Sequence, residues 1–301
     1  MMFFLIGDSS DSWFFDTFIE PWTWEFMRTG LAITLIAAIV CAILSCWLIL
    51  VGWSLMGDAL SHAILPGIVL AYMFGVPFSV GALIAALVVV ALIALIRRTS
   101  RVKEDTSIGV IFTTMFALGV MLISMYPTQI SMEHILFGDP LGITSKDMYQ
   151  VLVLGPIAFL LVMWKRRDLM LFAFDPTHAH AIGISTRKLS ALLVVALSLT
   201  VVIAMQAVGA ILIVALLITP GATAYLITSQ FQRMLWVSPL ISSLGVIIGF
   251  YVATWLHAAV GGTVVFVEGI IFVLVWIGSP HGLRGVLRTS KKHLLSETLP
   301  A

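Results

Sequence analysis

The sequence predicts an all-α, polytopic membrane helical bundle with eight or nine transmembrane spans, and three observations lead to this fold class. Of the 301 residues, 60% are hydrophobic and only 10% are charged, against about 25% charged in an ordinary soluble domain. Apolar runs of the roughly 20 residues that cross a bilayer recur along the chain. All but two of the 16 Lys and Arg residues lie in alternate linkers between these runs or in the C-terminal tail. A soluble enzyme of this length would need more polar surface, so that class is excluded.

The first segment, residues 1–27, is acidic and aromatic and carries no basic residue. Its aromatic part, residues 13–26, predicts a helix in the headgroup region; a docking surface for a partner is the alternative. A transmembrane domain over residues 28–280 and a basic tail over residues 281–301 follow.

Nine apolar segments within that domain are candidate spans. The count is eight or nine because one apolar segment can re-enter the membrane instead of crossing it. The second segment is interrupted by Asp58, His62 and Pro66. The segments lie near 29–51, 55–75, 78–97, 107–126, 149–165, 189–207, 209–228, 236–256 and 263–278.

The basic residues predict the orientation of the spans. They gather in the linkers 97–106 and 165–188, at Arg233 and in the tail, which all lie on one side if the spans cross as assigned. Lys and Arg are enriched on the cytoplasmic side of membrane proteins, so that side is predicted to be cytoplasmic. The near-neutral formal charge of +1 gives no reason to expect a nucleic-acid partner.

Asp58 and His62 are the most informative polar residues, because they stand four apart inside an apolar segment and so share one helix face. A charged Asp in the bilayer costs roughly 2.5–3.5 kcal/mol even on the mild insertion scale, and such a residue normally faces a cavity or a partner. A carboxylate with an imidazole suits a divalent ion such as Mn²⁺, Fe²⁺ or Zn²⁺. The alternative from the spacing alone is an Asp–His contact that pins two helices together.

Four further residues are weaker candidates for metal ligands. Glu133 and His134 lie in the linker predicted to be outside, where they could meet an incoming ion. His257 ends one span on the same side, and Glu268 lies early in the last span, so a His257–Glu268 contact across the turn is one hypothesis.

The linker 165–188 is expected to contain a short helix over about 175–186. Asp175 followed by Pro176 is typical of an N-cap with Pro at the first helical position, and Gly183 is a suitable helix stop. Ala179 and Gly183 are expected to form a small-residue face that another surface can approach closely. A helix lying on the membrane is the alternative.

Other sequence features restrict the function. Cys41 and Cys46 are five apart inside one apolar run, so they are expected to be packing residues and a disulfide framework is excluded. The chain has no Walker A sequence and no Gly-rich nucleotide fingerprint. Any uphill transport must therefore draw on an ion gradient or on another subunit.

Three stretches resemble the permease subunit of metal-ion ABC importers, the family that takes up manganese, iron and zinc. The resemblance runs from about residue 25 to residue 280. The sequence around His134 looks most like the manganese and iron branch. The chain departs from the family near the last hairpin, where many members have an Asp at the position of His257. The three stretches are Met56–Gly67, Phe174–Gly183 and Val208–Ala224.

The resemblance implies a fold like that of type II ABC importers and a bacterial cytoplasmic-membrane location. It implies that Asp58 and His62 form a metal site along the translocation path, and that Asp175, Ala179 and Gly183 belong to a coupling helix that docks on an ATPase. The implied partners are ATP-binding cassette ATPases, an extracytoplasmic metal-binding protein, membrane lipid and a second permease, either an identical copy or a similar chain. The permease itself would be no enzyme and hold no cofactor, since ATP is hydrolysed on the partner and the metal is cargo.

Two alternatives differ in cargo or energy source. One is a zinc importer permease of the same family. The other is a gradient-driven secondary transporter in which Asp58 and His62 relay protons; the coupling-helix pattern argues against it. A purely structural membrane subunit ranks third.

Overall fold

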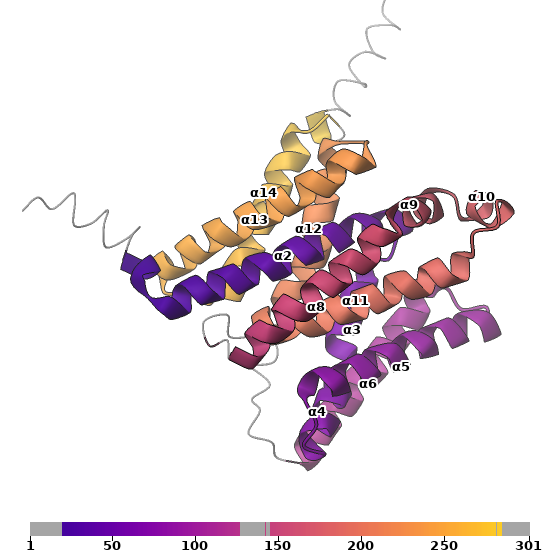
Figure 1. The fold of residues 1–301 in the computed structure, drawn as a ribbon, viewed down its shortest axis with the longest axis horizontal. Helices are drawn as coiled ribbons and strands as arrows, with labels where there is room; N and C mark the ends of the chain where they lie inside the picture. Colours follow the sequence, from indigo (N-terminus) through magenta and orange to yellow (C-terminus); the bar gives the residue numbers. More distant parts are fainter. Residues whose placement is uncertain (1–19, 127–141, 143–144, 281, 285–301) are drawn as a thin grey trace, which may run out of the picture.

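The computed structural model describes residues 20–126, 142, 145–280 and 282–284 (Figure 1). The secondary-structure elements of this part are all helices, and it contains no strand. A short 3-10 helix, η2 (Glu20–Thr23), precedes the first long helix. The helices are α2 (Glu25–Val51), α3 (Ser54–Ala63), α4 (Leu65–Met73), α5 (Phe78–Thr99), α6 (Glu104–Met125), α8 (Ser145–Trp164), α9 (Arg166–Phe174), α10 (Pro176–Ala181), α11 (Thr186–Val208), α12 (Ala210–Ile227), α13 (Phe231–Leu256) and α14 (Val260–Gly278).

The predicted membrane bundle is confirmed. Eight helices or helix pairs are long and apolar enough to cross a membrane, or nine if the bent pair α8 and α9 forms one further span. The boundaries agree with the predicted segments to within a few residues, because long apolar runs ended by polar linkers leave little freedom in where a span begins and ends.

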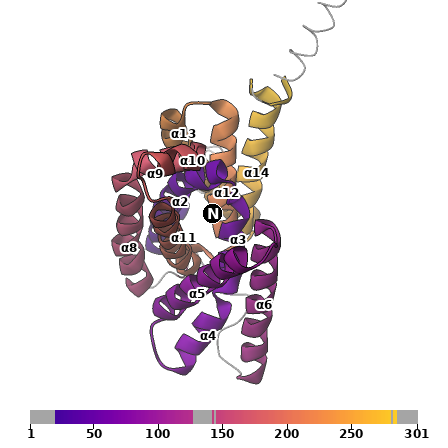
Figure 2. The same ribbon diagram turned by 90° about the vertical axis from the view of Figure 1, so that its right-hand side faces the viewer.

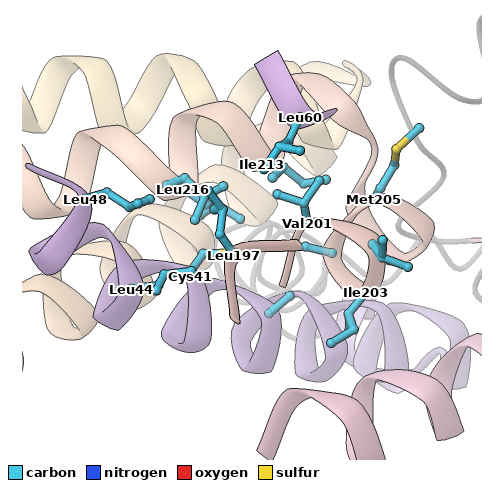
Figure 3. Close-up of a cluster of buried hydrophobic side chains, with 14 of the residues drawn as sticks. Cys41, Leu44, Leu48, Leu60, Leu197, Val201, Ile203, Met205, Ile213 and Leu216 are labelled. Atoms are coloured by element: carbon cyan, nitrogen blue, oxygen red, sulfur yellow. The ribbon is translucent and has the colours of Figure 1, made fainter. Parts of the chain in front are cut away.

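Helix α2 forms the centre of the bundle. It packs on α12 and α13 and on α8 and α11, as Figures 1 and 2 show from two directions. Its sequence is apolar on all sides, as expected for a buried helix. Leu44 and Leu48 of α2 meet Leu197 of α11 and Leu216 of α12 in the core drawn in Figure 3. Cys41 and Cys46 are buried free thiols in this helix, as predicted.

The second span is broken into α3 and α4, with Ile64 between them. Pro66 lies in the first turn of α4, where a missing backbone donor costs little. Helix α4 then packs on α5 through Gly67 and Gly81, whose added Cβ atoms would each clash with the backbone carbonyl of the other. The helices α4, α5 and α6 form a group at one edge of the bundle (Figure 1), which is joined to the rest by the packing of α6 on α3 and of α5 on α11.

A change of direction at Lys165 separates α8 from α9. The two helix axes differ by 65°, and α9 leads into the short helix α10 at the same end of the molecule as the start of α11 (Figure 1). The predicted helix over 175–186 is therefore shorter than expected, because it ends at Ala181 and α11 begins at Thr186.

Candidate functional site

Helix α3 presents one open face, and Asp58 and His62 lie on it. Leu55, Asp58 and His62 are partly or fully exposed and fall at positions i, i+3 and i+7, which line one side of a helix. Most of the remaining helix is buried against α6, α11 and α12. Gly57 permits the close approach of α12, since an added Cβ there would lie 3.0 Å from Leu217 Cδ1. The local packing thus fixes which two polar side chains stay accessible.

The two side chains point at each other across one helical turn. Asp58 Oδ1 and His62 Nε2 are 3.5 Å apart, and their side chains are 39% and 21% exposed. Two donor atoms that bind one ion at about 2.1 Å with an angle near 110° are separated by roughly 3.4 Å. The pair therefore has the spacing of two ligands on one metal ion, as well as that of a weak ion pair.

Two aromatic rings of α6 lie against the imidazole of His62. The centroids of Phe112 and Phe116 each lie 5.7 Å from that of His62, and Phe116 meets it edge-on. These two residues, spaced four apart on one face of α6, are part of the site that sequence reasoning missed. Their i, i+4 spacing was the available signal.

The described residues bring too few ligands together to hold a metal tightly. Among the described residues, no group of three or more His, Cys, Asp or Glu side chains could hold a metal ion together. At this place the described chain brings together two donor side chains, those of Asp58 and His62, both partly exposed.

Glu268 lies on α14, away from the Asp58–His62 pair, and is enclosed by the protein. It is fully buried, and its Oε1 accepts a hydrogen bond of 3.1 Å from Ser242 Oγ of α13. Its Cγ lies against Gly245, where an added Cβ would approach it to 2.7 Å. Its other oxygen, Oε2, has no hydrogen-bond partner in the described part of the chain.

The hypothesis of a His257–Glu268 contact is wrong. His257 is exposed and caps the end of α13 in a left-handed conformation, with φ 52°. The carboxylate of Glu268 instead reaches Ser242, which lies 15 residues before His257 and so about 22 Å away along the helix axis. Glu133 and His134 lie outside the described residues, so their proposed contact with an incoming ion stays a prediction.

The capping expected in the loop helix is present. The backbone N–H of His178 donates to Asp175 Oδ1 at 2.8 Å, and Pro176 opens the helix. Gly183 follows with φ +87°, and the N–H of Ile184 donates to the carbonyl of Ala179. These bonds form the helix-ending motif in which glycine supplies the left-handed residue.

The prediction that Ala179 and Gly183 form one accessible face is wrong for Ala179. Ala179 is completely buried within the chain, because α10 packs on α9 and α11 through its inner side. The outer side instead carries exposed residues that include His178, Ala181 and Ile182. The accessible side of α10 is therefore formed by these residues and Gly183, and Ala179 packs on its inner side.

The fold is that of a multi-pass membrane protein with eight or nine candidate spans. The model of the ABC 3 transport family matches residues 23–279. The chain belongs to this family, and it is a multi-pass protein of the bacterial membrane.

Relatives and a solved structure support this assignment. The manganese transport system membrane protein MntB of Synechocystis is 40% identical over 267 residues, which cover 89% of this chain and 87% of that protein. The chelated iron transport system membrane protein YfeD of Yersinia pestis is 41% identical over 263 residues, or 87% and 89% of the two chains. The structure of PsaBC from Streptococcus pneumoniae in complex with Fab matches with a TM-score of 0.81 and 34% identity, covering 90% of this chain and 97% of that one.

Proposed function

We propose that the chain is the permease of an ATP-driven importer for divalent transition-metal ions, with manganese or iron as cargo. The observation that carries the proposal is the accessible Asp58–His62 pair inside a broken span, with donor atoms 3.5 Å apart. Relatives whose names specify manganese and iron transport support the choice of cargo.

The ion path is proposed to lie between two permeases. Each chain contributes an exposed half-site of one carboxylate and one imidazole, so two chains would supply up to four ligands. That ligand set admits Mn²⁺ and Fe²⁺. The charge of two Asp58 side chains would offset the cost of removing the ion from water, and the modest number of ligands would permit release. An open polar face on α3 is costly against lipid, which favours its being covered by a second permease.

The energy is proposed to come from ATPase subunits that dock on α10. This short helix is capped at both ends and rests on α9 and α11, so a force on its outer residues would be transmitted into two longer helices. An extracytoplasmic binding protein would deliver the ion on the opposite side.

The test is metal uptake measured per folded complex in membranes that contain the partner ATPase. Asp58→Asn keeps the size of the side chain and removes its charge, whereas His62→Ala removes one ligand and leaves the charge. We expect both variants to assemble and both to lose uptake, with the larger loss for Asp58→Asn. Asp105→Asn, an exposed carboxylate at the start of α6, is the matched control and should transport normally.

The outcomes separate the alternatives. Uptake that continues with a catalytically dead ATPase would indicate a gradient-driven transporter. Unchanged uptake per folded complex in both variants would show that Asp58 and His62 only pin helices. If Zn²⁺ inhibited uptake at lower concentrations than Mn²⁺ or Fe²⁺ do, zinc would be the cargo of this permease.

A further inference from the structure

The imidazole of His62 has fewer polar contacts than a histidine that binds a metal usually has. Such a histidine ordinarily donates its other ring N–H to a carboxylate or a carbonyl, and that second bond fixes the direction of the ring. Of the described residues, Asp58 alone makes an ion pair or hydrogen bond with the His62 side chain. The torsion that turns an imidazole ring is also intrinsically soft. The direction of this ring therefore depends on what packs against it.

Three aromatic rings form one cluster at this place. The centroids of Phe112 and Phe116 each lie 5.7 Å from that of His62, and their planes are inclined to it by 51° and 82°. The two phenyl rings are themselves 6.3 Å apart. All three distances fall within the range of roughly 4.5–7 Å in which aromatic rings attract each other. A turn of the imidazole about its Cβ–Cγ bond would therefore change both of its ring contacts at once.

The packing of α6 sets the position of the two phenyl rings. Phe112, Phe116 and Gly119 fall at positions i, i+4 and i+7, so they share one face of the helix. This face meets α3 and α4. A Cβ added at Gly119 would lie 2.8 Å from Cγ of Leu65, the first residue of α4, so α6 approaches closely beside the break in the second span. The close contact at Gly119 fixes the register of α6, and with it the place of both rings beside His62.

We propose that Phe112 and Phe116 are positioning residues, which hold the imidazole of His62 with Nε2 directed toward Asp58. The inference rests on the proposed function in treating His62 as a ligand of the transported ion. A ligand that is already held in its binding direction loses less freedom when the ion arrives. The two rings thus take the place of the second hydrogen bond and strengthen a site that has few ligands.

The first measurement is the reaction of His62 with diethyl pyrocarbonate in the purified full-length chain, located by mass spectrometry. The exposed imidazole of His257 in the same sample is the reference. Phe112→Leu and Phe116→Leu keep an apolar side chain beside the imidazole but remove one aromatic contact. Each should raise the rate at His62, relative to that at His257, by roughly 3- to 10-fold, which is the effect of one aromatic pair. Phe116→Tyr keeps the ring and should react at nearly the parent rate.

Two controls separate positioning from loss of structure. Met121→Ala removes a large apolar side chain from the exposed far side of α6 and should leave the rate at His62 unchanged. The buried thiols of Cys41 and Cys46 should stay unreactive toward a maleimide in every folded variant. If Phe116→Leu exposes these thiols, Phe112→Leu decides the outcome.

The second measurement is Mn²⁺ uptake in membranes that contain the partner ATPase. Loss of positioning should raise KM in Phe112→Leu and Phe116→Leu by roughly 3- to 10-fold and leave kcat nearly unchanged, whereas loss of folded complex would lower kcat alone. The proposal is overturned if the Leu variants react at the parent rate, if Met121→Ala raises the rate equally, or if Phe116→Tyr reacts as fast as Phe116→Leu. A faster reaction at His62 with an unchanged KM would support the positioning and would remove His62 from the metal path, so failure of the two proposals can be told apart.

Discussion

The close approach of α4 and α5 predicts whether an alanine at Gly67 raises or lowers the stability of the chain. In the structure, a Cβ added at Gly67 would lie 2.5 Å from Ala85 Cβ and still closer to the carbonyl oxygen of Gly81. Carbon atoms in contact normally stay about 3.5–4.0 Å apart. Gly67→Ala therefore requires the two helices to separate by roughly 1 Å, at the cost of about 1–3 kcal/mol that overpacking typically carries.

The matched control is Gly109→Ala in α6. Nothing lies within 4 Å of the Cβ that this change would add, so only the better helix propensity of alanine acts, and it stabilises by up to about 1 kcal/mol. The two variants thus introduce the same methyl group but are expected to change the stability in opposite directions.

The assay is thermal unfolding of the purified chain in one detergent. At roughly 2 °C per kcal/mol, Gly67→Ala should lower the apparent Tm by about 2–6 °C, whereas Gly109→Ala should leave it unchanged or raise it slightly. Gly81→Ala should behave like Gly67→Ala, and the double variant should lose less than the sum, because one separation of the helices relieves both clashes. A Tm for Gly67→Ala equal to that of the control would refute the close helix packing.

Three further outcomes test other parts of the structure. Ser242→Ala leaves the buried carboxyl group of Glu268 without its donor and should cost about 1–3 kcal/mol of stability; an unchanged Tm would contradict the pairing. Gly183→Ala places a side chain at a position with φ +87° and should destabilise the end of α10 by about 1 kcal/mol. Proteolysis of the linker should then be faster than in the parent chain; equal rates of proteolysis would contradict the helix-ending motif at Gly183. A cysteine at Ser100 should be protected from an impermeant thiol reagent outside intact cells, whereas one at Ala258 should react; the reverse pattern would invert the orientation.

The spans could be predicted because hydrophobicity over 20 residues is a strong, local signal. The capping of α10 was equally local, since Asp175, Pro176 and Gly183 act on backbone groups within a few residues. The direction in which Ala179 points could not be predicted from neighbouring residues in the sequence. It depends on α9 and α11, which a six-residue helix meets only after the chain has folded.

The partner of Glu268 was missed for a different reason. The hypothesis joined residues that flank the turn between α13 and α14. In an antiparallel helix pair, however, a residue far from the turn in one helix lies opposite a residue about equally far from the turn in the other helix. Glu268 is about two turns into α14, so its neighbours lie well inside α13, where Ser242, Gly245 and Gly249 form a face of small residues. That row of small residues was a usable signal for the close packing of two helices.

Burial distinguishes Asp58 from Glu268, two carboxylates that lie well inside their spans. Both residues look alike in sequence, since each is an acidic side chain in an apolar segment. A site for cargo must exchange its ligands with water or with a passing ion, so its donor atoms must be reachable. Asp58 meets this condition, with a side chain 39% exposed beside a partly exposed imidazole, whereas Glu268 is fully enclosed and bonded to Ser242. A transported ion would have to part α13 from α14 to reach Glu268, but it could reach Asp58 without moving any helix of the same chain. Accessibility, which only the folded structure provides, is therefore the physical reason why we propose the metal path at α3 and propose that Glu268 serves the packing of the last two helices.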